Sequence, residues 1–114
     1  MSEIPLPKKV FNCQEIKSCM HEILHQHLHD QQYDFQQCNA LVKTLSNLVK
    51  DALKTLGYER YKFIIQIFIY PENEESLQMI CRSYWDSQTD RCAQSIYMNS
   101  FLICIATAFG IFYY

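Results

Sequence analysis

The strongest constraint on the fold of this chain is its carboxyl-terminal run, residues 101–114. These fourteen residues carry no charged side chain and include five aromatic rings, so most of them must be buried. A membrane-spanning helix needs about 20 apolar residues and usually has basic flanks, and this run is too short and has no such flanks. Its β-branched and aromatic residues, together with Gly110, favour a buried β-strand instead. We therefore expect the chain to end inside its own sheet and to have no membrane partner.

The rest of the chain divides into two helical patterns followed by three strand patterns. The first helix is expected from Asn12, which with Glu15 forms a capping box, to about residue 30. The second is expected from Asp34 as N-cap to residue 56, with Gly57 as a left-handed C-cap. Strands are expected over 62–70, 77–85 and 92–98, before the fourth at the carboxyl end. The order predicts an α+β fold in which two N-terminal helices pack on a four-stranded antiparallel sheet.

Both faces of the predicted sheet are apolar. On the first strand Phe63, Ile65 and Ile67 alternate with Ile64 and Phe68, and side chains of a strand alternate between the two faces. Two helices can cover only one face, and a monomer rarely exposes an apolar patch larger than a few hundred Å². The simplest cover for the second face is another copy related by a two-fold axis. The pattern therefore predicts a homodimer.

No motif in the sequence indicates catalysis, a cofactor or nucleic-acid binding. The formal net charge is −2, and there is no basic block, which argues against a phosphate-backbone partner. The chain has only two glycines and no phosphate-binding loop. Its six cysteines form no Cys-x-x-Cys pair and are expected to be reduced and packed as small hydrophobic residues. No secretory signal is visible at the N-terminus. We expect a non-enzymatic protein without a cofactor.

One cluster of side chains could bind a metal. His21, His25 and His29 are four residues apart on one face of the first helix, a spacing that can bind zinc or copper. That face is the polar one, so a solvated surface is the interpretation adopted, and no metal site is predicted. His27 lies on the apolar side of the pattern and is expected to be a core histidine.

The sequence resembles the Tctex-type dynein light chains over about residues 15–114. The resemblance rests on Tyr61–Gln66 at the first strand, on Arg82, Trp85, Asp86, Thr89 and Asp90, on Asn99, and on the aromatic closing run Phe109–Tyr114. It identifies residues 12–114 as one light-chain domain and residues 1–11 as a short lead-in. It implies a non-catalytic homodimer in which the second strand is exchanged between protomers.

The family resemblance also implies a partner and a place for it. Such light chains bind an extended segment of the dynein intermediate chain, and sometimes cargo proteins, by strand addition beside the dimer interface. The implied location is the cytoplasm, on the cytoskeleton, or the ciliary axoneme. The predicted groove lies along the exchanged edge strand, at Leu77, Met79, Cys81, Ser83 and Trp85. The predicted dimer interface comprises Ile64, Phe68, Trp85 and Phe112. Two alternatives stay open: the same dimer as a motor-independent scaffold for disordered partners, or a metal-binding protein that uses the histidine face.

Overall fold

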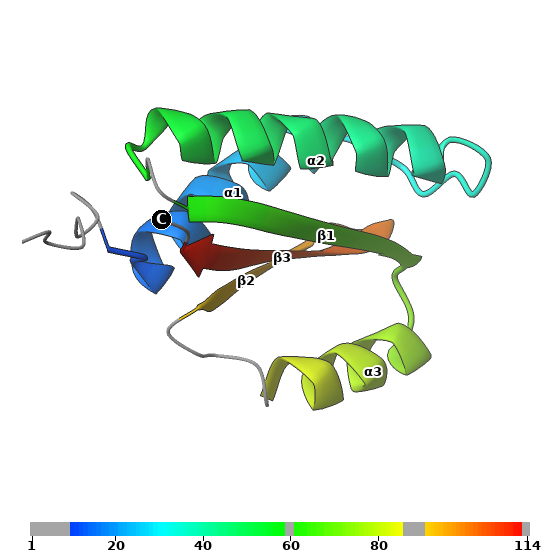
Figure 1. Cartoon of the computed structure of the whole chain (residues 1–114). Coiled ribbons are helices and arrows are strands. Elements are labelled where there is room, and N and C mark those ends of the chain that lie inside the picture. Colours follow the sequence, from blue (N-terminus) through cyan, green and yellow to red (C-terminus); the bar gives the residue numbers. More distant parts are fainter. Residues whose placement is uncertain (1–9, 59–60, 86–90, 113–114) are drawn as a thin grey trace, which may run out of the picture.

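The computed structural model describes residues 10–58, 61–85 and 91–112, with the side chains of 81–85 excepted. Three helices and three strands follow one another along the chain (Figure 1). Their bounds are α1 Cys13–Leu28, α2 Cys38–Thr55, β1 Tyr61–Pro71, α3 Glu74–Trp85, β2 Cys92–Met98 and β3 Leu102–Phe112. The fold is α+β, as predicted.

The sheet has three strands in the order β1-β3-β2, and both pairings are antiparallel. The carboxyl-terminal strand β3 is the central one, so the uncharged run lies inside the sheet as expected. Helices α1 and α2 cover one face of this sheet, whereas α3 lies on its other side (Figure 1). We call these the covered face and the open face.

The core lies between the covered face and the two long helices. Ile16, Met20, Leu24 and Leu28 of α1 recur every four residues and are fully buried, because this spacing keeps them on one side of a helix. α2 adds Leu45, Val49 and Leu53 at the same spacing. The sheet presents the buried residues Leu102, Cys104, Ala106 and Ala108. The small side chains in this row leave room for the helices to approach β3 closely.

The start of α1 is held by Tyr58, which follows the C-terminal end of α2. Asn12 is the N-cap, and its side-chain oxygen accepts a hydrogen bond from the Glu15 backbone N–H at 3.2 Å. The Tyr58 hydroxyl accepts a hydrogen bond from the Asn12 backbone N–H and donates one to the Glu15 carboxylate. The predicted N-cap is therefore confirmed, and Tyr58 links the Asn12 backbone to the Glu15 side chain.

The end of α1 is tied to the β2–β3 hairpin by Asn99. Its amide nitrogen donates to the carbonyls of Leu28 at 2.7 Å and Gln31 at 3.0 Å. Its amide oxygen accepts hydrogen bonds from the backbone N–H groups of Phe101 and Leu102. One side chain thus satisfies a carbonyl at the helix end, where such groups have no intrahelical partner, and also shapes the hairpin loop.

Helix α2 begins later than predicted. Asp34 caps the turn that precedes the helix, since its side chain accepts a hydrogen bond from the Gln36 N–H at 2.9 Å. The helix itself begins at Cys38. Its end agrees with the prediction, because Gly57 has a φ of +94°, in the left-handed region that favours glycine.

The predicted second strand, 77–85, is wrong in this structure: residues Glu74–Trp85 form α3, and the sheet has three strands instead of four. The helix has clear start signals. The Asn73 side chain accepts a hydrogen bond from the Ser76 N–H at 2.8 Å, and Glu74 and Glu75 occupy the first turn, where negative charge is favourable. A strand at this position needs a neighbouring strand to pair with, and among the described residues none lies beside it.

Candidate partner-binding surface

The open face of the sheet carries a row of exposed apolar side chains. Direct pairs in the strand register place Ile64 opposite Phe109, and Phe68 opposite Ile105. Ile64 is 44% exposed and Phe68 is 47% exposed. Other exposed apolar residues around this face are Met98, Phe101, Phe109 and Ile111. The side chains of the covered face are buried by helices, whereas these have no equivalent cover within the described chain.

A polar row crosses the middle of the open face. Gln66 of β1, Thr107 of β3 and Gln94 of β2 are opposite one another in the register. The Gln94 amide donates to the Thr107 hydroxyl at 3.2 Å. The open face is therefore two apolar halves separated by a hydrogen-bonding row, a pattern that can fix the register of whatever packs on it.

The predicted interface residues do not form a single patch. Ile64 and Phe68 lie together on the open face. Phe112 pairs with Tyr61, and their rings lie 5.6 Å apart at one end of the covered side. The Trp85 side chain lies outside the described residues. The interface prediction left out four exposed residues around this face, Met98, Phe101, Phe109 and Ile111. The alternation of side chains along the last strand could have identified Phe101, Phe109 and Ile111.

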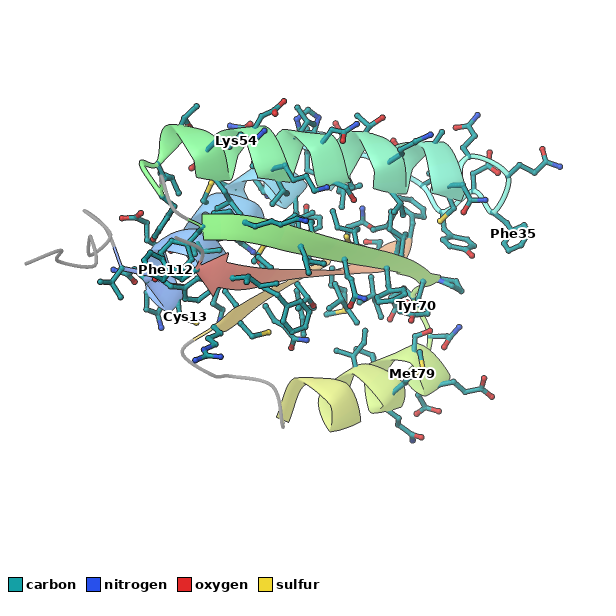
Figure 2. The ribbon with its side chains drawn as sticks, viewed as in Figure 1. Cys13, Phe35, Lys54, Tyr70, Met79 and Phe112 are labelled. Atoms are coloured by element: carbon teal, nitrogen blue, oxygen red, sulfur yellow. The ribbon has the colours of Figure 1, made fainter. Side chains whose placement is uncertain are left out.

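The predicted groove residues lie on α3 and not on a strand. Leu77 is half-buried and Met79 is 44% exposed; Figure 2 shows Met79 on this helix. The side chains of Cys81, Ser83 and Trp85 lie outside the described part of the chain. Ser76 and Ile80 are buried, and one helical turn separates them.

Within the described chain, each outer strand of the sheet has one edge with no strand paired to it, and that edge lies beside a helix. Next to β1, two hollows lie between the strand and α2. One, of about 400 Å³, is lined by Lys50, Lys54, Tyr61, Lys62 and Phe63. The other, of about 340 Å³, includes Tyr33, Phe35, Val42 and Phe68 in its lining. A third hollow, of about 810 Å³, lies between α1 and β2 and includes Lys17, His21, His25 and Ile96.

The histidine face is packed against a tyrosine. His21 and His25 are exposed, and their rings lie 6.0 and 5.7 Å from the ring of Tyr97. His29 contacts Asp30 at 2.9 Å. Within residues 10–58, 61–85 and 91–112, no three His, Cys, Asp or Glu side chains are placed to hold a metal ion. His27 is exposed, so the expectation of a core histidine was wrong.

The described cysteines are free thiols that serve packing. Cys13, Cys19, Cys38, Cys92 and Cys104 form no disulfide. Burial raises the pKa of the Cys104 thiol to about 12, and burial also raises the pKa values of Cys19, Cys38 and Cys92. A raised pKa disfavours the thiolate, which is the nucleophilic form. These four thiols are therefore poor nucleophiles.

Comparisons with known proteins agree with this arrangement. The Tctex-1 family profile matches residues 10–111. A zebrafish (Danio rerio) protein, Dynein light chain Tctex-type protein 2B, is 40% identical over 110 residues, which cover 96% of this chain and 73% of that protein. The human (Homo sapiens) protein of that name is 36% identical, covering 96% of this chain and 78% of its own length. Human Dynein light chain Tctex-type 5 is 26% identical over 93% of this chain and 59% of its own length.

No helix among the described residues is long and apolar enough to cross a membrane.

Proposed function

Because this chain belongs to the Tctex-1 family and is related to the Tctex-type dynein light chains, which are non-catalytic, we propose that it is a homodimeric adaptor of a microtubule motor. In this role it binds an extended segment of a dynein intermediate chain, and in some assemblies a cargo protein. Its place is then the cytoplasm, on the cytoskeleton, or the ciliary axoneme.

The observation that carries the proposal is the open face. Ile64, Phe68 and Ile111 are 44%, 47% and 48% exposed on a sheet whose opposite face packs against α1 and α2. Exposed apolar surface of this kind is a feature of interaction sites. A second copy offers the same surface, and two such faces related by a two-fold axis can cover each other. The polar row at Gln66, Thr107 and Gln94 would fix how the two sheets align.

Two further observations support exchange of residues 77–85 between the copies. Helix α3 lies apart from the packed helices and makes few contacts with the rest of the fold (Figure 1). Among the residues that the structure describes, no strand pairs with the outer edge of β1. Unpaired strand edges are templates for pairing with another chain. In the proposed dimer this segment becomes a strand on the β1 edge of the partner protomer. Leu77, Met79, Cys81, Ser83 and Trp85 then lie along the edge that a guest segment meets.

The test is the mass of the full chain by light scattering, alone and with a dynein intermediate-chain peptide. We expect a dimer that takes up two peptides. Phe68→Glu should convert the dimer to a monomer, because a carboxylate would be buried in an apolar interface. Val10→Glu is the matched control, since Val10 is 68% exposed and lies off the open face.

Each outcome bears on a different part of the proposal. A monomeric wild-type protein at micromolar concentration would refute the dimer. A dimer that ignores the peptide would refute motor binding and point to the scaffold alternative. Equal effects of Phe68→Glu and Val10→Glu would show that the open face is not the interface.

A further inference from the structure

The outer edge of β2 faces a hollow that the proposed dimer does not use. Among the described residues no strand pairs with this edge, and the hollow of about 810 Å³ lies between it and α1. In the proposed dimer the open faces pack together and the exchanged segment pairs with β1, at the opposite edge of the sheet (Figure 1). The β2 edge is therefore a separate surface, and it adjoins the histidine face, to which the proposed function gives no role.

Helix α1 and strand β2 lie side by side and run in the same direction. At their first residues, the Cys13 thiol donates to the Cys92 carbonyl at 3.7 Å. Further along, the rings of His25 and Tyr97 lie 5.7 Å apart. Beyond β2, the Asn99 amide donates to a carbonyl at the end of α1. Because these contacts follow the same order along both elements, a segment added to the β2 edge would lie along the length of α1.

Alternate residues of β2 direct their backbone groups away from β3. The Gly110 N–H donates to the Arg91 carbonyl at 2.9 Å, so the backbone of Arg91 faces β3. Backbone groups of successive residues in a strand point to opposite sides, and the Cys92 carbonyl accordingly meets Cys13 on the α1 side. Ile96 lies four residues after Cys92, faces the same way, and lines the hollow. The hollow therefore contains backbone groups with which an added strand can pair.

A stripe of basic and imidazole side chains faces the same hollow. Lys17, His21 and His25 line it at intervals of one helical turn, which is about 6 Å along the helix axis. Alternate side chains of an extended strand are about 6.8 Å apart. The two spacings nearly match, so three side chains on one face of an added strand can each meet one member of the stripe. The rings of His21 and His25 also pack beside Tyr97.

The charge of this hollow depends on pH. Its lining includes Glu22, whose formal charge cancels that of Lys17, and the neighbouring His29 contacts Asp30 at 2.9 Å. Histidine side chains ordinarily gain a proton between about pH 8 and pH 5. A neutral imidazole donates one hydrogen bond, whereas a protonated imidazole donates two and carries a positive charge. His21 and His25 therefore make the hollow more favourable for carboxylates as the pH falls.

We propose that the β2 edge binds, by strand addition, an extended protein segment that carries carboxylates on alternate residues. Backbone pairing holds the segment, and its carboxylates accept hydrogen bonds from His21, His25 and Lys17. A second copy of the chain is a poorer occupant, because the strand that it offers, Cys92–Met98, contains no carboxylate. The inference goes beyond the proposed function and does not depend on the dimer, since one chain supplies the lining described above.

The preference can be tested with synthetic peptides and the full-length chain. The probe is a fluorescein-labelled peptide of about ten residues in which Glu alternates with Thr. One matched peptide has Gln in place of Glu, and another has the same composition with Glu and Thr in separate blocks. Fluorescence anisotropy is measured at about pH 6 and about pH 7.5, where the Glu side chains stay ionised. We expect the alternating Glu peptide to bind at least about tenfold tighter than both matched peptides at the lower pH, and to weaken at the higher pH.

Backbone methylation tests the mode of binding. Alternate N–H groups of an added strand face its neighbour, and N-methylation removes the donor. Two versions of the Glu peptide are methylated either on the Glu residues or on the Thr residues. One version should lose binding, whereas the other should bind like the unmodified peptide.

Variants of the chain locate the site. His21→Gln combined with His25→Gln should remove the pH dependence and most of the preference for Glu over Gln. His27→Gln is the matched control, because His27 is exposed on the same helix and does not line the hollow. All three histidines are exposed, so urea unfolding should give similar midpoints for both variants.

The outcomes decide whether the edge is such a site. Loss of the pH dependence in the double variant alone, together with loss of binding in one methylated peptide alone, would support the inference. Equal binding of the Glu and Gln peptides, equal binding of the two methylated peptides, or equal effects of His27→Gln and the double variant would each overturn it. If light scattering shows assemblies larger than a dimer and no peptide binds, another copy occupies the edge and the inference is wrong.

Discussion

The two faces of the sheet have similar composition and different surroundings. On the covered face, Leu102, Cys104, Ala106 and Ala108 are fully buried under α1 and α2. On the open face, Ile64, Phe68 and Phe109 are 38–47% exposed. Large side chains stand on the open face and small ones on the covered face of β3. The covered face is packed by the chain's own helices, whereas the open face keeps exposed apolar side chains that the proposed partner copy would cover.

The largest expected contrast between the faces comes from truncating one side chain on each side. Leu24→Ala removes a fully buried side chain from the covered side and should lower the free energy of unfolding by about 2–5 kcal/mol at any protein concentration. Ile64→Ala should lower the free energy of unfolding only at protein concentrations where the dimer forms. A partner copy that binds only the folded chain stabilises it to an extent that depends on protein concentration. Urea unfolding at several protein concentrations distinguishes the two. A concentration-independent loss for Ile64→Ala would contradict the comparison.

The covered face also depends on the link between α1 and the hairpin. Asn99→Ala removes the hydrogen bonds to Leu28, Gln31, Phe101 and Leu102. We expect a loss of about 2–3 kcal/mol in unfolding free energy, because buried or half-buried groups lose their partners. Asn99→Asp keeps the oxygen that accepts from Phe101 and Leu102 and loses the amide N–H groups that donate to Leu28 and Gln31. If the loop contacts contribute to stability, the Asp variant should be less stable than the wild type and more stable than the Ala variant in the same urea experiment. An Asp variant as unstable as the Ala variant would assign the role to the helix link.

The end of the sheet near Phe11 is tightly packed. A Cβ added at Gly110 would lie 2.5 Å from Cδ2 of Phe11, so Gly110→Ala must displace that ring. The expected cost is roughly 1–3 kcal/mol, measured by thermal or urea unfolding. Gly57→Ala is the comparison: it meets no atom within 4 Å but is strained at a φ of +94°, and about 1 kcal/mol is expected. If adding Phe11→Ala restores the lost stability of the Gly110→Ala variant, the clash with the Phe11 ring is the cause.

A further effect is expected only at alkaline pH. Burial raises the pKa of Tyr58 to about 12 from a usual value near 10, so the neutral phenol is favoured in the folded chain. The unfolded chain then ionises first, and stability should be complete below about pH 10 and decline as the pH rises toward about 12. Urea midpoints over this range should show the decline, and Tyr58→Phe should reduce it. If stability declines with pH equally steeply in the Tyr58→Phe variant, the group that ionises is another residue.

Local signals predicted most of the elements correctly. The period of Ile16, Met20, Leu24 and Leu28 predicted the buried stripe of α1, and Asn12 predicted its start. Gly57 marked the end of the second helix, and the uncharged run became the central strand. These predictions depend on neighbours within a few residues, and this is the range over which capping and periodicity act.

The errors arose where the outcome depends on distant partners. Residues 77–85 have apolar spacing compatible with a strand or a helix, and Asn73 with Glu74 and Glu75 was a helix start signal that the strand prediction passed over. The predicted interface set of Ile64, Phe68, Trp85 and Phe112 stays a prediction, and the register places Phe112 with Tyr61 on the covered side of the sheet. The hollow lined by Lys50, Lys54 and Lys62 was not predicted, because these residues come together only when helix and strand lie side by side.

The sequence by itself determined that the chain has two amphipathic helices, a buried carboxyl-terminal strand and a sheet that is apolar on both faces, because side-chain period and charge are local properties. Only the tertiary structure decided that β3 lies at the centre, that three strands pair within the described residues, and that the open face is left uncovered by them. Strand order and helix placement are set by contacts between residues far apart in sequence. Their result is visible only when those contacts have formed.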